Sequence, residues 1–135
     1  MSAIGSVAGM ELTLEGCVAY AKETEINGKP LSKLQSIKFT LAEMATDTRM
    51  NRALLDAAIV GHMAGENVIA ETMMAKYASS EAGNLMADRA LDLFGEYGML
   101  EDNELVRSFR DVRITTIFAG TTEIMKTIIA QSMGL

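Results

Sequence analysis

Apolar residues recur every three or four positions along most of the chain, which is the spacing of one buried face of an α-helix. The first apolar stripe comprises Val7, Met10, Leu14, Cys17 and Ala21. It predicts a helix from Ser2 to about Lys22, and Gly28 and Pro30 follow soon after it, as is typical beyond the end of a helix.

Two further stripes predict long helices in the middle of the chain. The first runs from position 31 or 32 to about 61, where the run Gly61-His-Met-Ala-Gly65 interrupts it, and the second runs from 66 or 67 to Gly95 and Gly98. Their apolar faces comprise Leu34, Ile37, Leu41, Met44, Thr48, Leu55 and Ile59 in the first, and Ile69, Met73, Tyr77, Leu85, Met86, Ala90 and Leu93 in the second. At about 1.5 Å per residue the first helix is about 45 Å long, a length typical of helix bundles.

The C-terminal part of the chain predicts a short helix from about Asn103 to Arg113 and a last helix from Thr121 to Met133. The last helix has an apolar face of Ile124, Met125, Ile128, Ile129 and Met133. Nowhere do β-branched or aromatic residues alternate at length with polar ones, so no sheet is expected. The pattern predicts one all-α domain over residues 1–135, an up-and-down four-helix bundle.

Composition narrows the classes of function. The net charge of −6 and the interleaving of acidic and basic residues argue against a nucleic-acid partner, which requires a basic face. No apolar run approaches the ~20 residues of a membrane span, and the first ten residues lack the pattern of a signal peptide. The single cysteine, Cys17, lies on an apolar stripe, where a core residue is more common than a nucleophile. A soluble protein of a reducing compartment is expected.

A helix bundle can hold a carboxylate-bridged metal pair, which needs Glu-x-x-His on two of its helices. The chain has one histidine, His62, and the residue three positions before it is Ile59. His62 stands in a glycine-flanked stretch that predicts an exposed loop, and no third group is placed to orient it toward Cys17. Neither a metal site nor nucleophilic catalysis is expected.

The start of the last helix is the strongest candidate for a binding site. Gly120 interrupts the helical pattern there, and Thr121, Thr122 and Glu123 form the first helical turn. The first N–H groups of a helix have no partner within it, so they and a threonine hydroxyl can hold an anion or a polar heterocycle. A plain N-cap is the commoner role for a residue such as Thr121. Both interpretations stay open.

Three segments carry further information through their order and spacing. They are Arg110-Asp-Val-Arg-Ile with Phe118-Ala-Gly-Thr-Thr-Glu-Ile-Met; Tyr20 with Gly28-Lys-Pro-Leu31, Gln35 and Leu41-Ala-Glu-Met44; and Ala75-Lys-Tyr-Ala-Ser-Ser-Glu81 with Leu93-Phe-Gly-Glu-Tyr-Gly98. Each segment by itself is weak evidence of a relationship. Together they resemble the C-terminal helical domain of the acyl-CoA dehydrogenase family over nearly the whole chain.

This resemblance implies a flavoenzyme that uses FAD to oxidise acyl-CoA thioesters between the α and β carbons. It implies that Gly120, Thr121 and Glu123 contribute to the flavin site and that Phe118 forms part of its wall. It also implies homo-oligomers, dimers or tetramers, in the cytoplasm or the mitochondrial matrix. In the family, an N-terminal helical domain and a β domain complete the pocket, so acyl-CoA is expected to bind only if those domains are supplied.

Several positions depart from the family's pattern. Ala119 occupies the place of a glutamate that in many members removes the α proton, and a methyl group accepts no proton. The alternative place for this base falls before the first residue. Thr24 and Asn27 stand where the family has an arginine and a phenylalanine that help, from a neighbouring subunit, to hold the flavin, and Asp92 and Glu96 replace a glutamine and a glycine. Acidic side chains near a pyrophosphate repel it.

Two classes of function follow from these matches and departures. The first is an oxidoreductase domain that contributes to a flavin site, has no catalytic residue of its own and is inactive as an isolated chain. The alternative is a non-catalytic assembly module, a helical bundle that keeps an oligomerising surface and has lost flavin binding.

Overall fold

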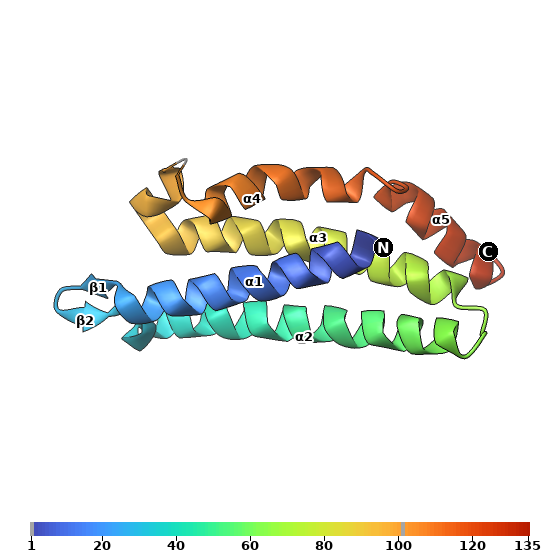
Figure 1. The fold of residues 1–135 in the computed structure, drawn as a ribbon, viewed down its shortest axis with the longest axis horizontal. Coiled ribbons are helices and arrows are strands. Elements are labelled where there is room, and N and C mark those ends of the chain that lie inside the picture. The colour runs from blue at the N-terminus through green and yellow to red at the C-terminus, as the bar shows by residue number, and fades with distance from the viewer. Residues whose placement is uncertain (1, 101) are drawn as a thin grey trace.

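The computed structural model describes residues 2–100 and 102–135. Three long helices run up and down beside one another: α1 (Ser2–Glu23), α2 (Gln35–Met63) and α3 (Ile69–Phe94). Two shorter helices, α4 (Glu104–Val112) and α5 (Thr122–Ser132), follow each other along α3 and together fill the fourth position of the bundle (Figure 1). The connections contain the 3₁₀ turns η1 (Leu31–Lys33), η2 (Gly95–Met99) and η3 (Arg113–Thr116). The all-α bundle is confirmed, with its fourth helix in two pieces.

A short hairpin joins α1 to α2 at one end of the molecule (Figure 1). Its strands β1 (Glu25–Ile26) and β2 (Lys29–Pro30) pair antiparallel. Asn27 (φ 53°) and Gly28 (φ 74°) between them are both left-handed, which is the backbone that a two-residue hairpin turn requires. The apolar pattern does not predict these strands, because two residues are too few to show alternation.

Most helix ends lie close to the positions expected from the apolar stripes. The start of α2 is later than expected, because Leu34 is extended (φ −73°, ψ 133°) and separates η1 from the helix. The end of α2 is also later: the helix continues through Gly61 to Met63, so His62 lies in its last turn and not in a loop, although its side chain is exposed as expected. Gly61 is needed for close packing, since a Cβ there would lie 2.6 Å from Cγ1 of Val68. The chain leaves the helix before Gly65 (φ 77°).

The three long helices bury two apolar clusters. The larger comprises Met10, Cys17, Met44, Met86, Ala90, Leu93 and Phe94, and the smaller comprises Ala3, Val7, Leu55 and Ala75. The predicted stripes are therefore buried at their centres. Six residues expected on buried faces are exposed: Leu34, Ile59, Ile69, Leu85, Ile124 and Met133. Leu34 precedes its helix, and in three other cases a sequence neighbour (Ala58, Met86 or Met125) takes the buried position.

Two arginines connect the long helices. Arg52 on α2 donates to both carboxylate oxygens of Glu11 on α1, at 2.9 and 2.6 Å, and this hydrogen bonding lowers the pKa of Glu11. Arg89 on α3 donates to Asp47 on α2 at 2.7 Å and lies 3.3 Å from Glu43. Because these side chains are only partly buried, the pairs contribute more to the register of the helices than to stability.

Candidate functional site

The predicted site lies in the tight turn between η3 and α5. Ala119 (φ 56°) and Gly120 (φ 101°) both have left-handed backbone, which is disfavoured for alanine. A Cβ on Gly120 would overlap Cε of Met125, a buried residue of α5. Position 120 therefore requires glycine, both for its φ angle and for the close approach of α5.

Thr121 is the N-cap of α5. Its backbone is extended (φ −68°, ψ 160°), and its hydroxyl oxygen accepts a hydrogen bond from the N–H of Ile124 at 3.5 Å. The Glu123 carboxylate accepts hydrogen bonds from its own N–H and from the Thr121 hydroxyl, which lowers the pKa of Glu123. Both predicted side chains therefore serve the start of the helix, and the N-cap interpretation of Thr121 is confirmed.

The backbone of the turn keeps donors that could serve a ligand. The N–H groups of Ala119, Gly120 and Thr121 make no hydrogen bond to any described residue. Consecutive N–H groups in a left-handed turn before a helix form a concave donor site. Because Glu123 places a carboxylate beside them, a neutral acceptor such as the edge of a polar ring suits these donors better than a phosphate does.

Two residues of α3 hold the turn through hydrogen bonds, and the apolar pattern of the sequence did not indicate either of them. Lys76 is 95% buried, with 5% of its surface exposed, and its Nζ donates to the carbonyl oxygen of Gly120 at 2.6 Å. The buried hydroxyl of Thr122 donates to the Glu81 carboxylate at 2.9 Å. Lys76 and Glu81 both lie in one of the segments that carry the family resemblance, but a contact across more than 40 positions leaves no trace in local periodicity.

A hollow of about 410 Å³ opens beside the turn, between α3, η3 and the start of α5. Its charged lining residues are Glu81, Arg113 and Glu123. Arg113 donates to the hydroxyl of Thr116 in its own 3₁₀ turn, so its guanidinium is held at the edge of the hollow. The lining is polar and carries both signs of charge, which suits a polar ligand better than an acyl chain.

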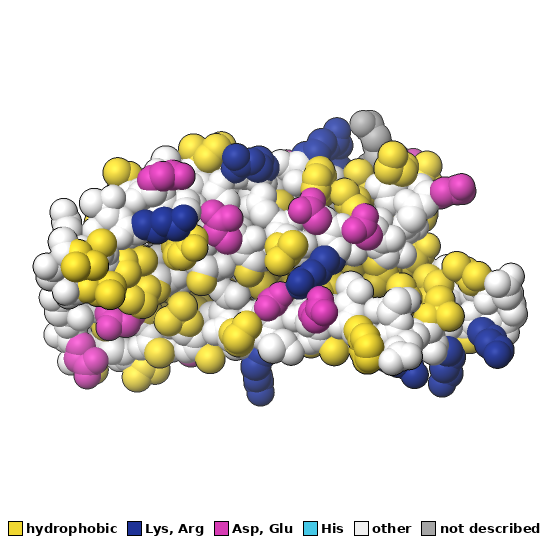
Figure 2. All heavy atoms as spheres, turned by 180° about the vertical axis from the view of Figure 1, so that it is seen from behind, with side chains coloured by type: hydrophobic (Ala, Val, Ile, Leu, Met, Phe, Trp, Pro, Cys, Tyr) yellow, Lys and Arg dark blue, Asp and Glu magenta, His cyan; other side chains and the backbone are white. Residues whose placement is uncertain are grey.

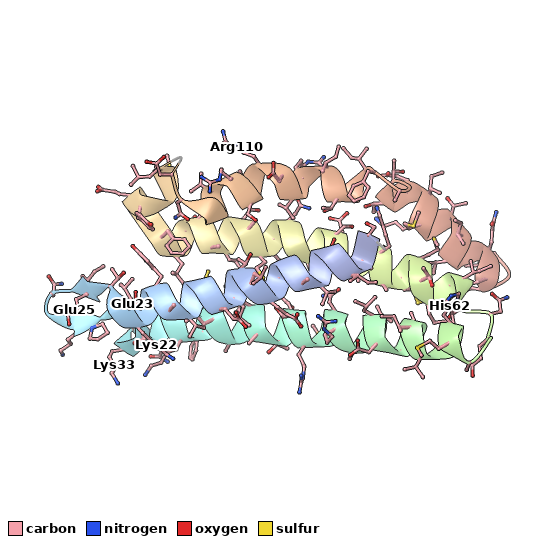
Figure 3. The ribbon with its side chains drawn as sticks, in the orientation of Figure 1. Lys22, Glu23, Glu25, Lys33, His62 and Arg110 are labelled. Atoms are coloured by element: carbon pink, nitrogen blue, oxygen red, sulfur yellow. The ribbon has the colours of Figure 1, made fainter. Side chains whose placement is uncertain are left out.

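The four other positions that depart from the family's pattern lie at the opposite end of the bundle. Thr24 closes the hairpin, since its carbonyl accepts from the N–H of Leu31 at 2.8 Å. Asp92 and Glu96 stand at the end of α3 and in η2, and the stacked rings of Tyr20 and Tyr97, 5.6 Å apart, bring that segment against α1. Figure 3 shows Glu23 and Glu25 at this hairpin end as well. One chain therefore does not bring Thr24, Asn27, Asp92 and Glu96 near the turn at Gly120.

The other candidates from the sequence have structural roles or none. Cys17 is fully buried, and burial raises the pKa of its thiol to about 11, so the thiol stays protonated near neutral pH. His62 lies at the far end of α2 from the hairpin (Figure 3). Within residues 2–100 and 102–135, no three His, Cys, Asp or Glu side chains converge to hold a metal ion. The same residues contain no helix that is both long and apolar enough to span a bilayer.

Comparison with known proteins identifies the fold. The family model of the acyl-CoA dehydrogenase C-terminal domain matches residues 1–134. The chain belongs to the acyl-CoA dehydrogenase family. It is 37% identical over 131 residues to the acryloyl-CoA reductase (NADH) of Anaerotignum propionicum, an alignment that covers 97% of this chain and 32% of that protein. The resemblance found in the sequence is confirmed.

Two solved structures superpose closely on the chain. The crystal structure of an acyl-CoA dehydrogenase from Geobacillus kaustophilus matches with a TM-score of 0.97 at 38% identity, over 99% of this chain and 35% of that chain. PigA, solved as a complex with FAD, matches with a TM-score of 0.92 at 31% identity, over 96% of this chain and 34% of its own. The chain therefore spans about a third of the length of these relatives.

Proposed function

We propose that the chain is the C-terminal helical part of an FAD-dependent enzyme that oxidises acyl-CoA thioesters, and that it contributes the turn from Ala119 to Glu123 to the flavin site. The observation that carries this proposal is the row of three consecutive N–H groups, from Ala119 to Thr121, that make no hydrogen bond to any described residue. They lie in a turn that hydrogen bonds connect to α3. A flavin ring has carbonyl oxygens and ring nitrogens along its polar edge, which are the acceptors that such donors need.

The two ends of the bundle differ in how well they fit FAD. The donors of the turn and the N-cap of α5 fit the polar edge of the ring, and when bound the flavin supplies the acceptor for hydride. The hairpin end fits a pyrophosphate poorly, because Thr24 offers no cation and Asp92 and Glu96 add negative charge there. We infer that this chain holds the ring more effectively than the phosphates.

The chain offers no base at the position that the family uses for proton abstraction. Ala119 stands directly before Gly120 in the turn, and its methyl group cannot accept the α proton of a thioester. We therefore propose that the chain contributes its turn to the site and does not contribute the base.

A chimeric enzyme tests this proposal. Residues 1–134 would replace the matching C-terminal third of the Geobacillus kaustophilus acyl-CoA dehydrogenase, and activity would be assayed with excess FAD. The chimera is expected to turn over acyl-CoA poorly, and Ala119→Glu is expected to raise the rate about 10²- to 10⁴-fold, the usual contribution of a general base. Ala119→Gln is the matched control, because it has the same shape and accepts no proton. A folded, flavin-bound chimera in which the two substitutions give equal rates would contradict the proposal.

A second function, assembly through this domain, is favoured by the apolar side chains on its surface. Figure 2 shows apolar side chains gathered at the end opposite the hairpin, where α2 turns into α3 and α5 ends. The large apolar side chains that are exposed there include Met63, Ile69 and Met133. Exposed apolar patches of this kind mark contacts between proteins, and closed two-fold pairing is the commonest form. We propose that the chain forms a homo-oligomer, a dimer or a tetramer.

Light scattering tests this assembly. A mass of two or four chains is expected at high protein concentration, and Ile69→Lys is expected to lower it because a charge in an apolar contact costs desolvation. Leu12→Lys on α1 is the matched control, since Leu12 is also exposed but distant from the patch. The mass of a single chain at every concentration would contradict self-association.

A further inference from the structure

Lys76 is a buried cation with an unusual partner. Lysine is rarely buried unless it is paired with a carboxylate, yet the ammonium of Lys76 donates a hydrogen bond to a backbone carbonyl, that of Gly120, at 2.6 Å. Glu81 on the same helix and Glu123 on α5 act on it only through longer-range attraction. Burial lowers the pKa of Lys76, because the charged ammonium loses its contact with water.

The carbonyl that Lys76 binds belongs to the strained part of the turn. Ala119 has left-handed backbone that alanine disfavours, so contacts from elsewhere must hold it. The Lys76 ammonium binds directly after Ala119, and the bond from Thr122 to Glu81 holds the chain two residues further on. Both contacts come from α3, the most central helix of the bundle.

We propose that Lys76 is a positioning residue for the flavin-facing turn: its ammonium, bonded to the Gly120 carbonyl, keeps Ala119 and Gly120 left-handed so that the N–H donors from Ala119 to Thr121 stay ordered. The use of these donors for a flavin rests on the proposed function. The placement of the turn by Lys76 does not, and it can be measured on the chain without any ligand.

The test is carbon-13 and amide NMR of the unmodified protein, followed by a variant. The Gly120 carbonyl signal is expected to move as pH rises, with the same midpoint as the side-chain signals of Lys76 and below the ordinary range of lysine. The charged groups that act on Lys76 are the carboxylates of Glu81 on its own helix and of Glu123 on α5. Lys126 also lies nearby on α5, with its Nζ 4.9 Å from the centre of the Tyr77 ring.

Lys76→Met is expected to move the Gly120 carbonyl signal at neutral pH and to abolish its titration. Loss of a charge-assisted bond is expected to make amide exchange at Met125, whose N–H is bonded to the Thr121 carbonyl, at least about tenfold faster. Lys126→Met is the matched control and is expected to leave both signals as they are. A general loss of structure would also increase the amide exchange rate at Met125. Circular dichroism and the exchange rates of core amides are therefore measured on the same variant.

The two levels of the proposal can fail separately. If the Gly120 carbonyl does not titrate with Lys76 in the unmodified protein, Lys76 does not position the turn, whatever the variant does. If the carbonyl titrates but FAD at millimolar concentration shifts none of the amides from Ala119 to Glu123, Lys76 still positions the turn and the assignment of the turn to flavin is wrong.

Discussion

Replacing Met44 with alanine is expected to lower the free energy of unfolding by about 2–5 kcal/mol. Met44 is fully buried in the larger apolar cluster, where it packs with Met10, Cys17 and Met86 from the two neighbouring helices. Truncation removes three heavy atoms from a site closed on all sides, so a cavity remains where the helices cannot move together. The measurement is urea or thermal unfolding at a fixed protein concentration, because self-association makes stability depend on concentration.

Met50→Ala is the matched control for this variant. Met50 lies on the same helix with 58% of its surface exposed, so its truncation is expected to change stability by no more than about 0.5 kcal/mol. Equal losses for both variants would show that the described bundle does not have its core at Met44.

The helices were predictable from the sequence because apolar periodicity reports the buried face directly. α1 keeps one stripe from Val7 to Ala21 without interruption, and its limits match the pattern within a residue. The start of α5 was equally predictable, since a glycine followed by threonine and glutamate is a local signal for a helix N-terminus. Local signals of this kind do not depend on the rest of the fold.

Features that depend on distant parts of the chain were not predictable. Glycine commonly interrupts a helix, and Gly61 was therefore expected to end α2. It lies inside the helix instead, where it allows Val68 to pack closely. The bond from Lys76 to Gly120 joins segments 44 positions apart, and only the folded bundle shows that this lysine faces inward. Leu85 and Met86 are consecutive apolar residues, and periodicity could not decide which of them is buried.

Catalysis is expected to be absent from the isolated 135-residue polypeptide, and Ala119→Glu is expected not to create it. Oxidation of an acyl-CoA needs a base beside the α carbon, a flavin ring beside the β carbon, and donors that polarise the thioester carbonyl, all in one place. The carboxylate introduced by this substitution would supply only the base. The tested polypeptide spans about a third of its relatives' length, so a ring bound at its turn would be open to water in this assay.

Flavin affinity is expected to be weak for a second reason. Thr24 cannot act on a pyrophosphate as an arginine does, and a charge-assisted contact is worth roughly 1.5–3 kcal/mol. Loss of one or two such contacts lowers affinity by about a hundredfold or more. Added flavin at high concentration compensates for this loss but cannot replace the missing wall of the pocket.

The most direct measurement is acyl-CoA-dependent reduction of a dye acceptor by the purified polypeptide with added FAD, run on the wild type and on Ala119→Glu. The central claim is that the chain contributes to an acyl-CoA dehydrogenase site and does not complete one. No reduction above that of free FAD is expected from either protein. Clear turnover by either protein, proportional to its concentration and dependent on acyl-CoA, would contradict this claim.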